Sequence, residues 1–313
     1  MKRYELLQKI KTRALELGFD KVGVAKSGPI DASIYHEWLE KGFHGQMAYM
    51  AKYLDKRFDP AQLVPGAKSV ISLAMNYYQK TEESSPDQGT ISLYALGDDY
   101  HEVMREKMKQ LLTDICVWIP DCEGRVFVDT APIQDKYWAV KAGIGWLGKH
   151  GNVITKEFGS WVFLGEIVIT EELEYDEPIP DYCGTCRKCL TACPTGAIVT
   201  PHIVDARKCI SYWTIEVNGE QKIPETVAAK MGNLVFGCDI CQNVCPWNKK
   251  FSKQTKESRF RARPHNINPA LTDLTNMSLE TFRIWYQKST IKRAKLKGLL
   301  RNARIALQNK TCI

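Results

Sequence analysis

The sequence lacks several features that would assign it to common protein classes. It has no apolar run of about 18 residues, which a transmembrane helix requires. Its first twenty residues, "MKRYELLQKIKTRALELGFD", carry acids and lack the apolar segment of a signal peptide. No GxGxxG motif follows a predicted strand, and Walker, HExxH and GxSxG motifs do not occur. We therefore predict a soluble, cytoplasmic protein without a Rossmann nicotinamide site.

Cysteine is abundant in this chain and concentrated in one region. There are eleven cysteines in 313 residues, and an odd count without an export signal favours metal ligation over disulfides. Cys183, Cys186, Cys189 and Cys193 follow the spacing CxxCxxCxxxCP. This spacing is typical of two-cluster ferredoxins, in which the fourth cysteine binds the other cluster. A zinc ribbon, the alternative, usually has two cysteine pairs separated by a longer loop.

The second cysteine set departs from a duplicate of the first. "CDICQNVCP" supplies Cys238, Cys241 and Cys245, but Val235 stands where a further cysteine is expected, so Cys209 is the available substitute. Eight ligands for two 4Fe–4S clusters result. The crossing rule predicts one cluster on Cys183, Cys186, Cys189 and Cys245, and the other on Cys193, Cys209, Cys238 and Cys241. Cys116 and Cys122 are expected to be buried thiols, and Cys312 a loose terminal thiol.

Positive charge is concentrated near the end of the chain. The net charge is +7, and residues 289–310 contain Lys and Arg but no acid. Such a run is either a solvated helix face or a phosphate-binding surface. The glycine-rich stretch 141–154 also has two interpretations. It is either the end of a helix followed by the start of a hairpin, or a place where the backbone approaches a bulky ligand closely.

Apolar periodicity predicts helices and strands before the cysteines and helices after them. Helices are expected at 2–18, 31–41, 46–54, 99–118, 133–143, 278–287 and 290–308, strands at 21–25, 68–78 and 125–130, and a two-stranded hairpin at 151–170. Acids and prolines replace the core pattern near 172–180, which predicts a domain boundary.

The chain resembles the epoxyqueuosine reductase family. The resemblance is carried in order by "RFDPAQLVPGAKSVISLAMNYY", "YALGDDYHEVM", "VDTAPIQDKYWAVKAGIGWLGKHGNVI", the cysteine sets, "CISYWTIE" and "IKRAKLKGLLRNARIALQN". It implies an α+β fold with a nitroreductase-like cobalamin-binding catalytic domain at 1–175. A ferredoxin-like domain with two 4Fe–4S clusters is expected at 176–250, and a basic helical tail that contacts tRNA at 251–313.

The resemblance also implies an activity and a set of partners. The implied reaction reduces epoxyqueuosine to queuosine at the tRNA wobble position, the last step of queuosine biosynthesis, with electrons from an unidentified low-potential donor. Many members carry helical repeats after the "LLRNA" helix, so this chain, ending at Ile313, is expected to offer a smaller tRNA surface. We predict a monomer. The alternatives are a dehalogenase-like cobalamin reductase and an electron-transfer iron–sulfur protein.

Individual site residues follow from the resemblance. Asp129 matches the family's acid and is the predicted proton donor, although an Asp before Thr-x-Pro also suits a turn. Donation at neutral pH would require burial to raise its pKa. Tyr100 and His101 either touch the substrate or cap a helix. The predicted cobalamin contacts are Arg57, Asp129, Lys149, His150, Asn152, Ser211 and Gln242.

The implied tRNA substrate needs cations for phosphates and aromatic rings for unstacked bases. The basic tail supplies the cations, and the segment after Cys209 supplies two rings, which could equally belong to the core. The predicted tRNA contacts are Tyr212, Trp213, Lys292, Arg293, Lys295, Lys297 and Arg301.

Overall fold

The computed structural model describes residues 3–310 and contains an antiparallel sheet of four strands. The strand order is β1 (Lys21–Lys26), β2 (Ser69–Asn76), β7 (Val162–Ile169) and β4 (Gly124–Phe127). Every neighbouring pair is antiparallel. The two central strands are the most apolar, because both of their faces are covered by other elements.

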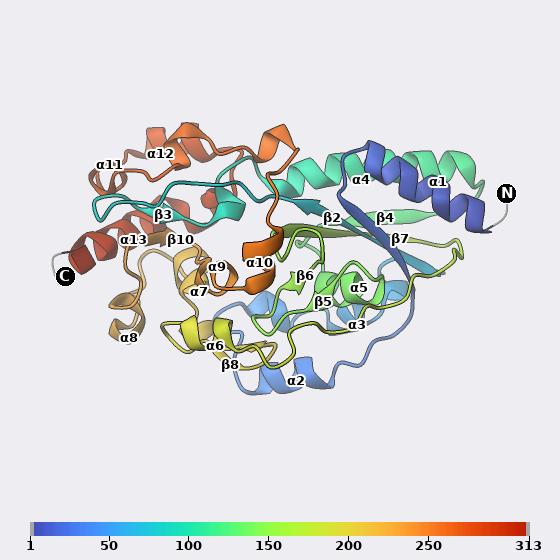
Figure 1. The fold of residues 1–313 in the computed structure, drawn as a ribbon, viewed down its shortest axis with the longest axis horizontal. Coiled ribbons are helices and arrows are strands. Elements are labelled where there is room, and N and C mark those ends of the chain that lie inside the picture. The colour runs from blue at the N-terminus through green and yellow to red at the C-terminus, as the bar shows by residue number, and fades with distance from the viewer. Residues whose placement is uncertain (1–2, 311–313) are drawn as a thin grey trace.

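Helices cover the two faces of this sheet (Figure 1). One face packs against α1 (Arg3–Glu16) and α4 (Tyr100–Trp118), and the other against α5 (Asp135–Lys141). Strand alternation sends Ile71 and Leu73 of β2 to the first face and Val70 and Ala74 to the second. By the same alternation, Ser72 of β2 lies on the α5 face.

Most elements predicted before the cysteines are present, with two differences. The predicted hairpin at 151–170 is wrong, because β6 (Val153–Ile154) pairs with β5 (Trp146–Leu147), whereas β7 joins the main sheet. The predicted helix at 46–54 is divided into the 3-10 turn η1 (Ala48–Ala51) and α3 (Leu54–Phe58), because Tyr53 adopts a left-handed φ of 55°. α2 spans Ser33–Glu40, and η2 spans Pro60–Gln62.

The cysteine region consists of short elements joined by loops. It lies beside α2 and the β5–β6 pair (Figure 1). The backbone N–H of Ala206 donates to the carbonyl of Phe43, which fastens this region to the segment after α2. Its elements are α6 (Lys188–Ala192), β8 (Ile198–Thr200), β9 (Ile203–Val204), η4 (Ala206–Lys208), α7 (Ile210–Ile215), α8 (Glu225–Ala228), β10 (Leu234–Phe236), α9 (Ile240–Asn243) and α10 (Pro246–Phe251).

The tail shares a core with earlier parts of the chain. β10 pairs in parallel with β3 (Thr90–Ile91), and Val235 and Phe236 pack with Leu271, Leu299 and Ala303 of the tail. The 3-10 turn η3 (Leu93–Ala95) joins this core. The tail elements are η5 (Ser258–Phe260), η6 (Pro264–Asn266), α11 (Leu271–Thr275), α12 (Leu279–Tyr286), η7 (Thr290–Ala294) and α13 (Lys295–Lys310). In residues 3–310, no helix is both long and apolar enough to cross a membrane.

Candidate functional site: two thiol groups and an acid centre

One group of four thiols surrounds a small cavity. The cavity has a volume of about 180 Å³, and Cys183, Cys186, Cys189 and Cys245 line it. Cys183 and Cys186 belong to the loop that leads into α6, Cys189 lies within α6, and Cys245 immediately precedes α10. Trp247 closes one side of the cavity. The fold therefore brings Cys245 to the three cysteines with which the crossing rule groups it.

A second group contains Cys193, Cys209, Cys238 and Cys241. Ionisation of Cys241 is opposed by burial and by negative charge on the other three thiols, so these four side chains lie near one another. Burial raises the pKa of Cys238 to about 12 and raises the pKa of Cys241 as well. Such thiols become thiolates only beside a strong positive charge, which iron supplies.

Both groups fit iron–sulfur clusters better than they fit single metal ions. Within residues 3–310, no three Cys, His, Asp or Glu side chains are close enough to hold one ion. A 4Fe–4S cluster binds one thiolate at each iron and therefore separates its ligands more widely than a single ion does. The groups have the membership that spacing predicts, and the ligand assignment itself stays a prediction.

An acid centre lies just after the end of β4, where the first residues of α4 meet Asp129. Asp129 has a left-handed φ of 53°, and its side chain is 65% exposed. Its Oδ2 accepts a hydrogen bond from the Tyr100 hydroxyl at 2.7 Å and lies 3.4 Å from His101 Nε2. Partial withdrawal from water raises the pKa of Asp129, but the hydrogen bonds from His101 and Tyr100 outweigh it and lower the pKa.

The lowered pKa corrects the predicted state of Asp129, because a proton at neutral pH resides on the neighbouring imidazole. His101 Nδ1 lies 2.6 Å from Asp99 Oδ1, and Asp99 Oδ2 lies 2.9 Å from Lys292 Nζ. Burial lowers the pKa of His101, but its contacts with Asp129 and Asp99 outweigh burial and raise the pKa to about 9. The acid centre is therefore an imidazolium between two carboxylates. Asp99 also caps α4 by accepting from the His101 backbone N–H.

The predicted proton donor thus belongs to a cluster whose other members sequence reasoning missed or left open. The sequence allows two roles for His101, substrate contact and helix capping, and it predicts that Lys292 contacts tRNA. Glu166 was missed, although it is a lone acid in the apolar strand "VFLGEIVI". A single acid in a central strand costs free energy unless its charge is removed or compensated, and this was the available signal.

Lys149 and His150, predicted at the cobalamin rim, line the cavity of the first thiol group. The Lys149 ammonium donates to the carbonyls of Gly184 and Cys186, so it fastens the cysteine loop to the preceding domain. Burial lowers the pKa of His150 to about 4, which keeps its imidazole neutral. Its Nδ1 accepts from the backbone N–H of Asn152 at 3.2 Å, and its buried Nε2 has no hydrogen-bond partner.

The other predicted cofactor contacts are distributed between the two domains. The buried guanidinium of Arg57 donates to the carbonyl of Tyr49 at 3.3 Å, and its Nε has no partner. Asn152 accepts a hydrogen bond from Lys136 Nζ at 3.1 Å. Ser211 is hydrogen-bonded to the thiol of Cys209, and Gln242 accepts from the Ser160 hydroxyl at 2.8 Å.

The structure corrects three of the predicted tRNA contacts. Tyr212 and Trp213 are only 5% and 7% exposed and belong to the core around α7, so no base can stack on their faces. The Arg301 guanidinium donates to the carbonyls of Trp213, Asn218 and Gln221. Burial lowers its pKa to about 10, and its donors are occupied within the protein.

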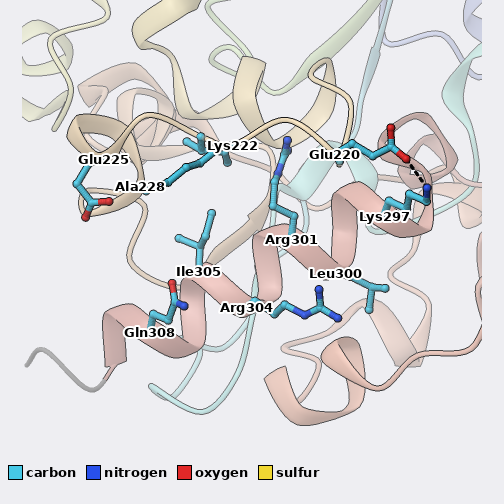
Figure 2. Close-up of a pocket in the computed structure, with 12 residues that line it drawn as sticks. Glu220, Lys222, Glu225, Ala228, Lys297, Leu300, Arg301, Arg304, Ile305 and Gln308 are labelled. Atoms are coloured by element: carbon cyan, nitrogen blue, oxygen red, sulfur yellow. Dashed lines mark hydrogen bonds and ion pairs between the residues drawn. The ribbon is translucent and has the colours of Figure 1, made fainter.

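Of the remaining predicted cations, Lys297 lines a groove between α13 and residues 219–228. Figure 2 shows Lys297 and Arg304 on α13 and Lys222 on the opposite wall of this groove, whose volume is about 550 Å³. Lys297 pairs with Glu220, and Arg293 pairs with Glu216 at 2.6 Å. Lys295 is exposed at the start of α13.

The cysteines outside the two groups have ordinary surroundings. Cys122 is buried as predicted, whereas Cys116 is only half-buried; its thiol donates to the carbonyl of Cys122 at 3.2 Å. Cys312, predicted to be a loose terminal thiol, lies outside the described residues.

A helix-covered sheet with an acid centre, joined to a module with two groups of four thiols, defines a class: an oxidoreductase with a double iron–sulfur module. Two family models agree. Residues 182–248 match "4Fe-4S double cluster binding domain", and residues 57–130 match "Epoxyqueuosine reductase QueG, DUF1730". The chain belongs to the epoxyqueuosine reductase family.

Relatives and solved structures support this membership over nearly the whole chain. The epoxyqueuosine reductase of Cellulophaga algicola is 45% identical, and the match covers 94% of this chain and 95% of that protein. An epoxyqueuosine reductase solved with a tRNA-Tyr epoxyqueuosine-modified stem loop is 32% identical, has a TM-score of 0.90, and matches over 99% of this chain and 82% of that one. The Bacillus subtilis enzyme, solved with its catalytic aspartate loop swung out of the active site, is 30% identical with a TM-score of 0.90 and the same coverage.

Proposed function

We propose that this protein reduces epoxyqueuosine to queuosine at the wobble position of tRNA, the last step of queuosine biosynthesis. The observation that carries the proposal is the placement of the acid centre beside the second thiol group. The Lys136 ammonium is influenced by the charges of both Asp129 and Cys241, so the acid and the thiols border one region. The relative solved with an epoxyqueuosine-modified stem loop supports the same substrate. A tRNA substrate places the reaction in the cytoplasm.

We propose the same domain boundaries and domain roles that the sequence predicts. Residues 1–175 form the catalytic domain, 176–250 the double-cluster domain, and 251–313 the tail that contacts tRNA. Two 4Fe–4S clusters would be held by the two thiol groups, and electrons would come from a low-potential donor. The monomeric state stays a prediction.

Cobalamin is the cofactor we propose for the catalytic domain. Buried donors without protein partners fit a ligand whose rim carries many amide carbonyls; Arg57 Nε and Gln134 Nε2 are such donors. Asn152, which accepts from Lys136, would contribute an amide, while Ser211 and Gln242 would border the cofactor near the second thiol group. When bound, cobalamin would supply the two-electron chemistry at the epoxide.

The acid centre supplies one of the two protons that the reaction requires, and solvent supplies the other. Removing an epoxide oxygen breaks two C–O bonds, forms a C=C bond and releases water. The reaction consumes two electrons and two protons. Asp129 lies 3.4 Å from the His101 imidazolium, and its side chain is otherwise largely exposed. A proton can therefore pass from His101 through the Asp129 carboxylate to the departing oxygen. Tyr100 fixes the orientation of that carboxylate.

For tRNA, we propose that phosphates lie along the groove between α13 and residues 219–228. Lys222 and Arg304 face this groove and have no ion-pair partner among the residues that the structure describes. Lys295 and Lys297 would extend the positive surface along α13, while Lys292 pairs with Asp99 of the acid centre and Arg293 with Glu216. A helix that presents cations along one side suits a phosphate backbone.

The test is a reaction with tRNA that carries epoxyqueuosine. The protein is purified anaerobically, reconstituted with iron, sulfide and cobalamin, reduced, and assayed by nucleoside analysis for queuosine. We expect Asp129→Asn to lower kcat by about three orders of magnitude, since its amide cannot relay a proton. Its iron content and cob(II)alamin absorption should equal those of the wild type. Failure of the wild-type protein to form queuosine, or turnover by Asp129→Asn, would contradict the assignment.

A further inference from the structure

A buried carboxyl group lies beneath the acid centre and has no part in the proposed reaction. Glu166 of β7 is fully buried, and Ser72 is its register partner on β2. The Ser72 hydroxyl donates to Glu166 Oε1 at 3.2 Å. Strand alternation points both side chains to the α5 face, whereas their apolar neighbours in sequence fill the α1–α4 face.

The partner of Glu166 is a second acid. Asp135, the first residue of α5, is hydrogen-bonded to Glu166, and Glu166 Oε2 has no other partner. Ionised carboxylates only accept hydrogen bonds, so this contact requires a proton on one of the two groups. Burial and mutual repulsion raise the pKa of Glu166 well above its usual value, and burial raises that of Asp135 to about 6. A single proton is thus shared by the pair at neutral pH.

Asp135 connects this pair to the acid centre. Its Oδ1 accepts a hydrogen bond from the backbone N–H of Asp129 at 3.3 Å. Asp129 has a left-handed φ of 53°, a conformation that costs a non-glycine residue on the order of 1 kcal/mol. A segment that carries such a cost keeps its shape only when its surroundings hold it.

We propose that Glu166 and Asp135 form a proton-sharing latch that holds residues 128–134 so that Asp129 faces the substrate. Protonated Glu166 donates to Asp135, which stays ionised and accepts from the Asp129 backbone. Ser72 fixes the other oxygen of Glu166 to the central sheet. Neither acid touches the substrate, so both are positioning residues. The proposal deepens the proposed function and rests on it for the identity of the reaction.

The latch is tested by asking whether a donor at position 166 is sufficient. Glu166→Gln keeps an N–H for Asp135 and an oxygen for Ser72, whereas Glu166→Leu keeps neither. Asp135→Ala removes the acceptor for the Asp129 N–H. We expect Glu166→Gln to retain kcat within about threefold, and the other two variants to lose about 100-fold, the scale for misplacing a catalytic group by about 1 Å. The KM for tRNA should change by less than about threefold, because these residues do not contact the substrate.

Hydrogen exchange measures the latch independently of activity. Exchange in residues 128–134 should accelerate at least about tenfold in Glu166→Leu and Asp135→Ala, and stay at the wild-type rate in Glu166→Gln. Asp20→Asn is the matched control, because Asp20 is a part-buried acid that accepts from the backbone of Asn76 at 2.7 Å on the same sheet. It should leave this exchange unchanged.

Two results would overturn the latch: Glu166→Gln as defective as Glu166→Leu, or wild-type exchange in both Glu166→Leu and Asp135→Ala. If Glu166→Leu does not fold, Asp135→Ala and Glu166→Gln decide the question between them. The expected exchange pattern in a wild-type protein that forms no queuosine would support the latch and reject the proposed reaction.

Discussion

The two thiol groups and the acid centre are assembled in opposite ways. The thiols come from one continuous region, residues 183–245, in which short elements turn back on each other. The acid centre draws on three separate parts of the chain: 99–101 at the start of α4, 129–136, and Lys292 in the tail. Local spacing can therefore specify the first kind of centre, whereas only the folded sheet creates the second.

The largest expected effect tests the assembly of the thiol groups. If Cys183 and Cys245 bind the same cluster, Cys183→Ala/Cys245→Ala should retain about four of eight irons per chain. Both substitutions then remove ligands of one cluster, and the other cluster keeps all four of its ligands. Cys193→Ala/Cys245→Ala should lose nearly all iron, since each change removes a ligand of a different cluster. Both double variants should be inactive, because the electron path is interrupted.

Iron and sulfide analysis of the reconstituted proteins distinguishes these outcomes. Cys116→Ser is the matched control, because Cys116 lies outside both groups and donates only to a backbone carbonyl. It should retain both clusters. Equal iron contents in the two double variants would show that the spatial groups do not correspond to the clusters.

The same contrast explains how much of the protein could be predicted from sequence. The spacing CxxCxxCxxxCP determines the geometry of a loop within a few residues, so the membership of both thiol groups can be predicted from the sequence. The replacement of the missing cysteine by Cys209 also has a physical reason: Val235 lies in β10 at 0% exposure, in the core that joins the cysteine region to the tail. A cluster at Val235 would disrupt that core.

Other side chains could not be placed because their roles depend on distant partners. Tyr212 and Trp213 adjoin a cysteine, and nothing in the local sequence shows that α2 and its following loop cover them; the Gln46 backbone N–H donates to the Tyr212 hydroxyl at 2.8 Å. Arg301 looked like one of several free cations. It differs from its neighbours because α13 packs against α7 and the segment after it, where four backbone carbonyls accept from its guanidinium.

An intermediate effect tests the electrostatics of the acid centre. Folded His101 has a pKa of about 9, against an unfolded value of about 6.5. The folded protein therefore binds more protons between these pH values, and the stability that His101 contributes is complete below about pH 6.5 and lost as the pH rises through 9. We expect kcat to fall above about pH 9. This decrease is the alkaline limb of the pH–rate profile. His101→Asn should remove the alkaline limb and lower kcat by about 100-fold at neutral pH.

The pH–rate profile of kcat under saturating tRNA provides the measurement. Iron content and cob(II)alamin absorption of His101→Asn serve as controls, because the substitution leaves both thiol groups intact. An unchanged alkaline limb in His101→Asn would assign the limb to another group.

The smallest effect tests whether the tail contributes to the acid centre rather than to tRNA binding alone. Lys292→Met removes the cation that holds Asp99, so His101 should be positioned less well and kcat should fall by only about two- to fivefold, the scale of a partly exposed ion pair. The alkaline limb should move to higher pH, because a positive charge near the imidazolium has been lost.

Lys107→Met is the matched control, since Lys107 on α4 makes a 2.9 Å ion pair with Glu257 without touching the acid centre. Steady-state kinetics at two salt concentrations separates the two roles of Lys292. A change confined to the KM for tRNA, which disappears at high salt, would assign Lys292 to phosphate binding alone. A lowered kcat with a shifted alkaline limb, absent from Lys107→Met, would show that the tail completes an acid centre whose other members lie at least 125 residues earlier in the chain.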